Sequence, residues 1–125
     1  MTKRHRLLVI DDNEQFAAIL SSFLSKRYDV FTAYNGLEGL KVLEAREGKI
    51  NLVITDLVMP EISGVGVISV IKKKYPGTPV IAITGGGRHP SAVAIDYDAD
   101  VVLNKPFDFE DLERHVTELL TKKLK

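Results

Sequence analysis

Short apolar runs alternate along the chain with stretches in which apolar residues recur every three or four positions. The short runs are typical of β-strands. Four of them are continuous apolar or β-branched stretches, as expected for strands covered on both faces. Strands are expected at Leu7–Ile10, Val30–Ala33, Leu52–Thr55, Val80–Ile83 and Val101–Leu103.

The intervening stretches have the spacing of amphipathic helices. The first helix is expected to follow an N-cap at Asp12 or Asn13, the second an N-cap at Asn35, and the last an N-cap at Asp108. A short fourth helix is expected to begin at Pro90, a residue favoured at the first helical position. The other periodic segments are Phe16–Leu24, Leu37–Leu43, Val67–Tyr75 and Leu112–Leu120.

Five strand–helix units with short connections predict a parallel sheet with helices on both faces. The 125 residues are an ordinary size for one domain, and the sequence contains no linker, repeat or low-complexity stretch. We therefore expect a single domain over residues 1–125, with no output domain.

Composition excludes several classes of function. Seventeen basic residues balance seventeen acidic ones, so no charge footprint for direct binding to nucleic acid is present. The apolar runs are too short to cross a bilayer, no basic amphipathic anchor points to a membrane surface, and we expect a cytoplasmic protein. The absence of cysteine excludes disulfides, thiolate catalysis and cysteine zinc sites.

Polar side chains follow the predicted strands at the points where these end. Asp11 and Asp12 follow the first strand, Asp56 the third, Thr84 the fourth, and Lys105 comes shortly after the fifth. Ligands of open parallel sheets bind outside the carboxyl ends of the strands. We therefore expect these five side chains to lie at one edge of the sheet.

The combination of acids, alcohol and amine suits phosphoryl chemistry. Carboxylates that lie close together repel and need a cation, and Mg²⁺ is a hard ion that carboxylates and phosphate oxygens bind. Lys105 supplies a second cation and Thr84 a hydroxyl donor. With charge neutralised in this way, one carboxylate can act as a nucleophile and form an acyl phosphate.

Four motifs, in order and over essentially the whole chain, resemble the signatures of a response-regulator receiver domain of two-component signalling, of the single-domain type. They are Val9-Ile10-Asp11-Asp12-Asn13, Thr55-Asp56-Leu57-Val58-Met59-Pro60, Ile83-Thr84-Gly85 and Asn104-Lys105-Pro106-Phe107. The resemblance implies a flavodoxin-like (CheY-like) three-layer α/β sandwich, with a parallel sheet in the order 2-1-3-4-5 and five helices.

The resemblance also implies a function as a phosphoacceptor switch. Asp56 would receive a phosphoryl group from the phosphohistidine of a sensor histidine kinase or a phosphotransfer protein. The protein would be a phosphoacceptor that promotes its own phosphorylation and dephosphorylation, not an enzyme. Phosphorylation would change the surface of helix 4, strand 5 and helix 5, which would bind a downstream protein or a second copy of the chain.

Roles for the remaining site residues follow from the same resemblance. Asp11 and Asp12 would hold Mg²⁺ together with Asp56 and the backbone carbonyl of Val58. Thr84 would be the switch hydroxyl and Lys105 the phosphate partner. The bond between Lys105 and Pro106 is expected to be cis.

The chain departs from the family pattern near Thr84 and Lys105. Val102 stands where the family often has an aromatic residue that rotates on activation. Gly86 occupies a position whose side chain often tunes the lifetime of the phosphoryl group. Gly85–Gly87 make the loop after Thr84 permissive, because glycine reaches positive φ without steric cost. We expect this loop and the fourth helix to move most between states.

Other interpretations stay open at this point. Asp11 or Asp12 can serve as a helix cap, Asp56 as a turn residue, and Lys105 as a solvated strand end. A phosphohydrolase of the haloacid-dehalogenase type needs a second aspartate two residues after the nucleophile, where this chain has Val58. A receiver-like interaction module that works without phosphorylation is the alternative function, although no acidic, threonine or lysine position of the motifs is lost.

Overall fold

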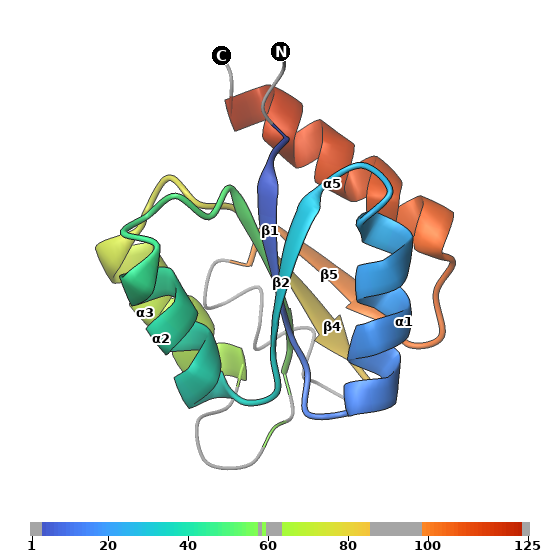
Figure 1. The fold of residues 1–125 in the computed structure, drawn as a ribbon, viewed down its shortest axis with the longest axis horizontal. Coiled ribbons are helices and arrows are strands. Elements are labelled where there is room, and N and C mark those ends of the chain that lie inside the picture. The colour runs from blue at the N-terminus through green and yellow to red at the C-terminus, as the bar shows by residue number, and fades with distance from the viewer. Residues whose placement is uncertain (1–3, 58, 60–63, 86–98, 124–125) are drawn as a thin grey trace.

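A five-stranded parallel sheet forms the centre of the molecule (Figure 1). The computed structural model describes residues 4–57, 59, 64–85 and 99–123. Each predicted strand is present with at most one residue of difference at either end, and the order β2-β1-β3-β4-β5 is the one that the resemblance implied. The strands are β1 (Arg6–Ile10), β2 (Asp29–Ala33), β3 (Leu52–Asp56), β4 (Val80–Thr84) and β5 (Val101–Asn104).

Four helices lie among the described residues: α1 (Glu14–Leu24), α2 (Gly36–Ala45), α3 (Gly64–Lys74) and α5 (Phe109–Lys123). Asn13, rather than Asp12, is the N-cap of α1, and its side chain accepts a hydrogen bond from the Phe16 N–H at 3.0 Å. Asn35 caps α2 in the same way, as predicted. The short helix expected from Pro90 lies outside the described residues.

The described helices cover both faces of the sheet, with α1 and α5 on one face and α2 and α3 on the other (Figure 1). Successive side chains of a strand point to opposite faces. Leu7 and Val9 of β1 therefore pack into the cluster under α1 and α5, while Leu8 and Ile10 pack into the cluster under α2 and α3. Each fully buried leucine or isoleucine stabilises the fold by roughly 1.5–3 kcal/mol.

Burial along the sheet depends on strand position. All residues of β3 and β4 are buried, and so are all residues of β1 after Arg6. Residues Val101–Leu103 of β5 are only half-buried because β5 is the last strand of the sheet, although Val102 packs against one cluster and Val101 and Leu103 against the other. None of the helices in the described part of the chain is long and apolar enough to span a bilayer.

Candidate functional site

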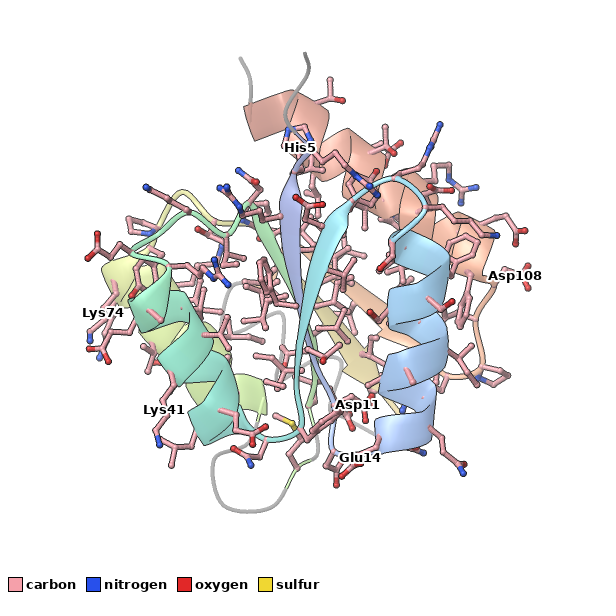
Figure 2. The ribbon with its side chains drawn as sticks, viewed as in Figure 1. His5, Asp11, Glu14, Lys41, Lys74 and Asp108 are labelled. Atoms are coloured by element: carbon pink, nitrogen blue, oxygen red, sulfur yellow. The ribbon has the colours of Figure 1, made fainter. Side chains whose placement is uncertain are left out.

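The ends of β1 and β3 bring two acidic residues together. Ile10 of β1 is in register with Thr55 of β3. The residues that follow them in the chain, Asp11 and Asp56, therefore lie side by side. The Asp11 N–H donates to the Ala33 carbonyl at 3.1 Å and extends the β1–β2 pairing by one residue. Figure 2 shows Asp11 at the opposite end of β1 from His5, and the acids therefore occupy the carboxyl edge of the sheet.

The ends of β4 and β5 bring Thr84 and Lys105 to the same edge. Asp56 is in register with Ile83 of β4, and Thr84 is in register with Asn104 of β5. The Lys105 N–H donates to the Thr84 carbonyl at 2.8 Å. The predicted gathering of the five side chains at one edge is therefore what the structure shows.

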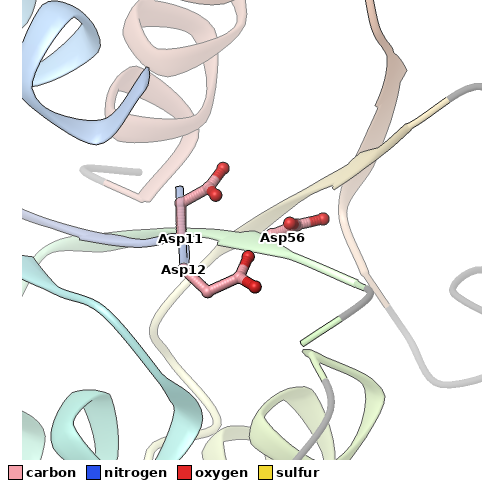
Figure 3. Close-up of side chains that lie close together, drawn as sticks. All are labelled: Asp11, Asp12 and Asp56. Atoms are coloured by element: carbon pink, nitrogen blue, oxygen red, sulfur yellow. The ribbon is translucent and has the colours of Figure 1, made fainter. Parts of the chain in front are cut away.

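Asp11, Asp12 and Asp56 form a carboxylate cluster (Figure 3). An oxygen atom from each lies within 4.8 Å of an oxygen from the other two. Asp11 is 1% exposed and Asp56 is 7% exposed, whereas Asp12 faces solvent. The Asn13 N–H donates to Asp11 Oδ1 at 2.9 Å and so fixes the orientation of this carboxylate.

Lys105 places its ammonium at the margin of this cluster. Its Nζ lies 3.5 Å from Asp11 Oδ2 and 4.3 Å from the centroid of the Phe16 ring. Among the residues that the structure describes, one ammonium beside three carboxylates leaves an excess of negative charge. Two unit charges about 4 Å apart interact by roughly 4 kcal/mol at an effective dielectric near 20, so the cluster favours binding of a further cation. The peptide bond between Lys105 and Pro106 is cis.

Thr84 carries a buried hydroxyl with no hydrogen-bond partner among the described residues. Its side chain is fully buried at the end of β4. Thr55, also fully buried, instead donates its hydroxyl to the Asp56 carbonyl at 3.0 Å. A buried hydroxyl without a partner lowers the stability of the fold by about 1–3 kcal/mol. An acceptor that enters the site and takes a hydrogen bond from the Thr84 hydroxyl would therefore be favoured.

The first residue of α3 lies against the backbone of Asp56. The Gly64 N–H donates to the Leu57 carbonyl at 3.1 Å. A Cβ atom at Gly64 would lie 2.0 Å from the Asp56 carbonyl oxygen and 2.7 Å from the Leu57 Cα. The absence of a side chain at position 64 is therefore what allows α3 to begin this close to Asp56.

The donor set of the cluster fits a magnesium ion. All the side-chain donors are carboxylate oxygens, the hard ligands that Mg²⁺ prefers, and no sulfur or imidazole donor belongs to the group. Asp11, Asp12 and Asp56 are the residues that would hold the ion. Val58, whose carbonyl was expected to complete the set, lies outside the described residues, as do Gly86 and Gly87 of the loop after Thr84.

Sequence reasoning missed the contact between Phe16 and Lys105. Phe16 was assigned to the apolar face of the first helix, and Phe107 was noted only as the last residue of the fourth motif. The structure shows that both, together with Phe109, belong to one aromatic group beside the Lys105 ammonium. No signal in the sequence links these residues, because the contact joins segments about ninety positions apart.

Comparisons with known proteins agree with this fold. The family model of the response regulator receiver domain matches residues 7–117. The transcriptional regulatory protein GlrR of Escherichia coli (strain K12) is 40% identical over a match of 120 positions, and the match covers 94% of this chain. The match spans only 27% of GlrR, so this chain corresponds to about a quarter of that relative's length.

Solved structures share the fold over nearly the whole chain. A response regulator receiver domain protein from Clostridium thermocellum is 32% identical with a TM-score of 0.89, and the match covers 95% of this chain and 96% of that one. The response regulator TrrA from Thermotoga maritima, solved with Mg²⁺ and BeF, is 34% identical with a TM-score of 0.81. That match covers 92% of this chain and 98% of TrrA.

Proposed function

Because this chain belongs to the response regulator receiver domain family, we propose that Asp56 accepts a phosphoryl group from the phosphohistidine of a sensor kinase or phosphotransfer protein. The observation that carries the proposal is the convergence of the carboxylate cluster, the Lys105 ammonium and the unpartnered Thr84 hydroxyl at one edge of the sheet. Among the three acids, Asp56 ends the central strand β3, which lies between β1 and β4.

The proposed transfer is a displacement at phosphorus. A carboxylate oxygen of Asp56 forms the new O–P bond while the P–N bond to the donor imidazole breaks. The departing nitrogen keeps the bonding electron pair, and the imidazole, already protonated at its other nitrogen, leaves as a neutral group. The aspartyl phosphate therefore carries the combined charge of the two reactants.

The residues around Asp56 have separate parts in this step. Lys105 offsets negative charge that develops on the phosphoryl oxygens, and the Thr84 hydroxyl donates a hydrogen bond to one of them. Receiver domains bind Mg²⁺ through acidic residues, and here Asp11, Asp12 and Asp56 would hold it. When bound, the ion supplies positive charge beside the phosphoryl oxygens. In this way the chain promotes its own phosphorylation. When water later attacks the phosphorus of the aspartyl phosphate, the same residues promote its dephosphorylation.

The proposed consequence is a change of surface. An aspartyl phosphate adds negative charge and new acceptor oxygens, which attract the Thr84 hydroxyl and the Lys105 ammonium. Both residues adjoin β5, since Thr84 pairs with Asn104 and Lys105 follows it. The surface of β5, α5 and the expected fourth helix would then bind a downstream protein or a second copy of the chain. The cytoplasmic location expected from the sequence remains part of this proposal.

The test is labelling with phosphoramidate, a small donor with the P–N bond of phosphohistidine. In the presence of Mg²⁺, the wild-type protein should gain one labile phosphoryl group by intact mass, and Asp56→Asn should gain none. Asp29→Asn is the matched control, because Asp29 is an exposed aspartate at the opposite edge of the sheet, and it should label like the wild type. Labelling of Asp56→Asn at the wild-type level would contradict the proposal. A wild-type protein that takes up no phosphoryl group would favour the interaction module that works without phosphorylation.

A further inference from the structure

Among the residues that the structure describes, few contacts hold the Lys105 ammonium in place. Its only hydrogen-bond acceptor among the described residues is Asp11 Oδ2 at 3.5 Å, which is beyond the usual range for such bonds. The side chain is 28% exposed, and a lysine stem has four flexible carbons. The other group next to the ammonium is the Phe16 ring, whose centroid is 4.3 Å away, well inside the distance at which an aromatic face attracts a cation.

The Phe16 ring is itself firmly held. The Phe16 N–H donates to the Asn13 side chain, which fixes the first turn of α1. Phe107 meets the ring edge-to-face at 6.1 Å with an angle of 87°, and Phe109 does so at 6.3 Å with an angle of 75°. These contacts come from the cap of α1, from the segment that precedes α5 and from the first residue of α5, so the ring presents a face of defined position to the ammonium.

We propose that Phe16 is a positioning residue for Lys105. It touches no phosphoryl oxygen. Its ring holds the ammonium beside the carboxylate cluster, so that less of the flexibility of the lysine side chain has to be lost when a phosphoryl group arrives. The consequence for phosphoryl transfer rests on the proposed function, but the contact itself does not.

The kinetic test compares variants that keep or remove the aromatic face. Phe16→Leu should slow phosphorylation by phosphoramidate by about 2- to 30-fold, the range expected for loss of one cation–π contact. Phe16→Tyr keeps the face and should restore a rate near that of the wild type. Phe23→Leu is the matched control: Phe23 lies in the same helix and packs on Phe109 at 5.3 Å, but it does not contact Lys105, and its rate should be unchanged. In a Lys105→Met background, Phe16→Leu should have no further effect.

A spectroscopic test needs no phosphorylation. The ring current of Phe16 should move the NMR signals of the Lys105 Hε protons upfield in the wild type and in Phe16→Tyr, and the displacement should vanish in Phe16→Leu. Lys105 signals at ordinary positions in the wild type would overturn the proposal, as would equal slowing by Phe16→Leu and Phe23→Leu. If the wild type shows the upfield signals but accepts no phosphoryl group, the proposed function fails while the positioning contact stands.

Discussion

Replacement of Thr84 by valine should stabilise the unphosphorylated protein, although most substitutions in a core destabilise. The hydroxyl is fully buried and has no hydrogen-bond partner among the described residues, which costs about 1–3 kcal/mol. Valine puts a methyl group of similar size in its place. We therefore expect Thr84→Val to raise the free energy of unfolding by about 1–2 kcal/mol.

Urea denaturation without Mg²⁺ measures this effect directly. With a denaturant slope of roughly 2 kcal/mol per molar for a protein of this size, the midpoint should rise by about 0.5–1 M. Thr55→Val is the matched control, since Thr55 is equally buried but donates its hydroxyl to the Asp56 carbonyl. Loss of that hydrogen bond should lower the free energy of unfolding by about 0.5–1.5 kcal/mol.

The same variant should have the opposite effect on the phosphorylated state. With Mg²⁺ and beryllofluoride as a phosphoryl mimic, wild-type Thr84 gains a charged acceptor, and Thr84→Val does not. The stabilisation that the mimic provides should therefore be smaller in the variant by about 1.5–3 kcal/mol. If Thr84→Val destabilises the resting protein as much as Thr55→Val does, the hydroxyl already has a partner and the reasoning is refuted.

Three further predictions concern the elements that build the site. Gly64→Ala should destabilise the fold by about 1–3 kcal/mol in thermal unfolding, because its Cβ would lie 2.0 Å from the Asp56 carbonyl oxygen. Gly77→Ala, where a Cβ meets nothing within 4 Å, is the control, and equal losses would contradict the steric argument. Asn13→Ala should cost about 0.5–2 kcal/mol through loss of the α1 cap, whereas Asn13→Asp should keep most of the stability. Mg²⁺ should raise the melting temperature of the wild type, and EDTA should abolish this rise. The rise should be smaller in Asp12→Asn, and a rise of wild-type size in that variant would exclude the Asp12 carboxylate as a ligand.

The elements of the fold could be predicted from the sequence because they depend on local patterns. Continuous apolar runs mark the buried strands, and the spacing around Phe16–Leu24 marks an amphipathic helix. The placement of Asp11 and Asp56 at one edge also followed from the sequence, since residues after parallel strands lie at the same end of a sheet. The strand order did not follow from periodicity; it came from the family resemblance.

Tertiary structure decided the details that local patterns do not encode. Asp12 and Asn13 are both good caps, and only the path of the chain out of β1 selects Asn13. The isolation of the Thr84 hydroxyl, the approach of Gly64 to Asp56 and the contact of Phe16 with Lys105 each depend on how separate segments pack. The sequence by itself thus determined which charged and hydroxyl side chains reach the site from the strand ends, because strand ends are a local property. Only packing of distant segments decided which atoms there have partners, because hydrogen bonds and ring contacts depend on distances of a few ångströms.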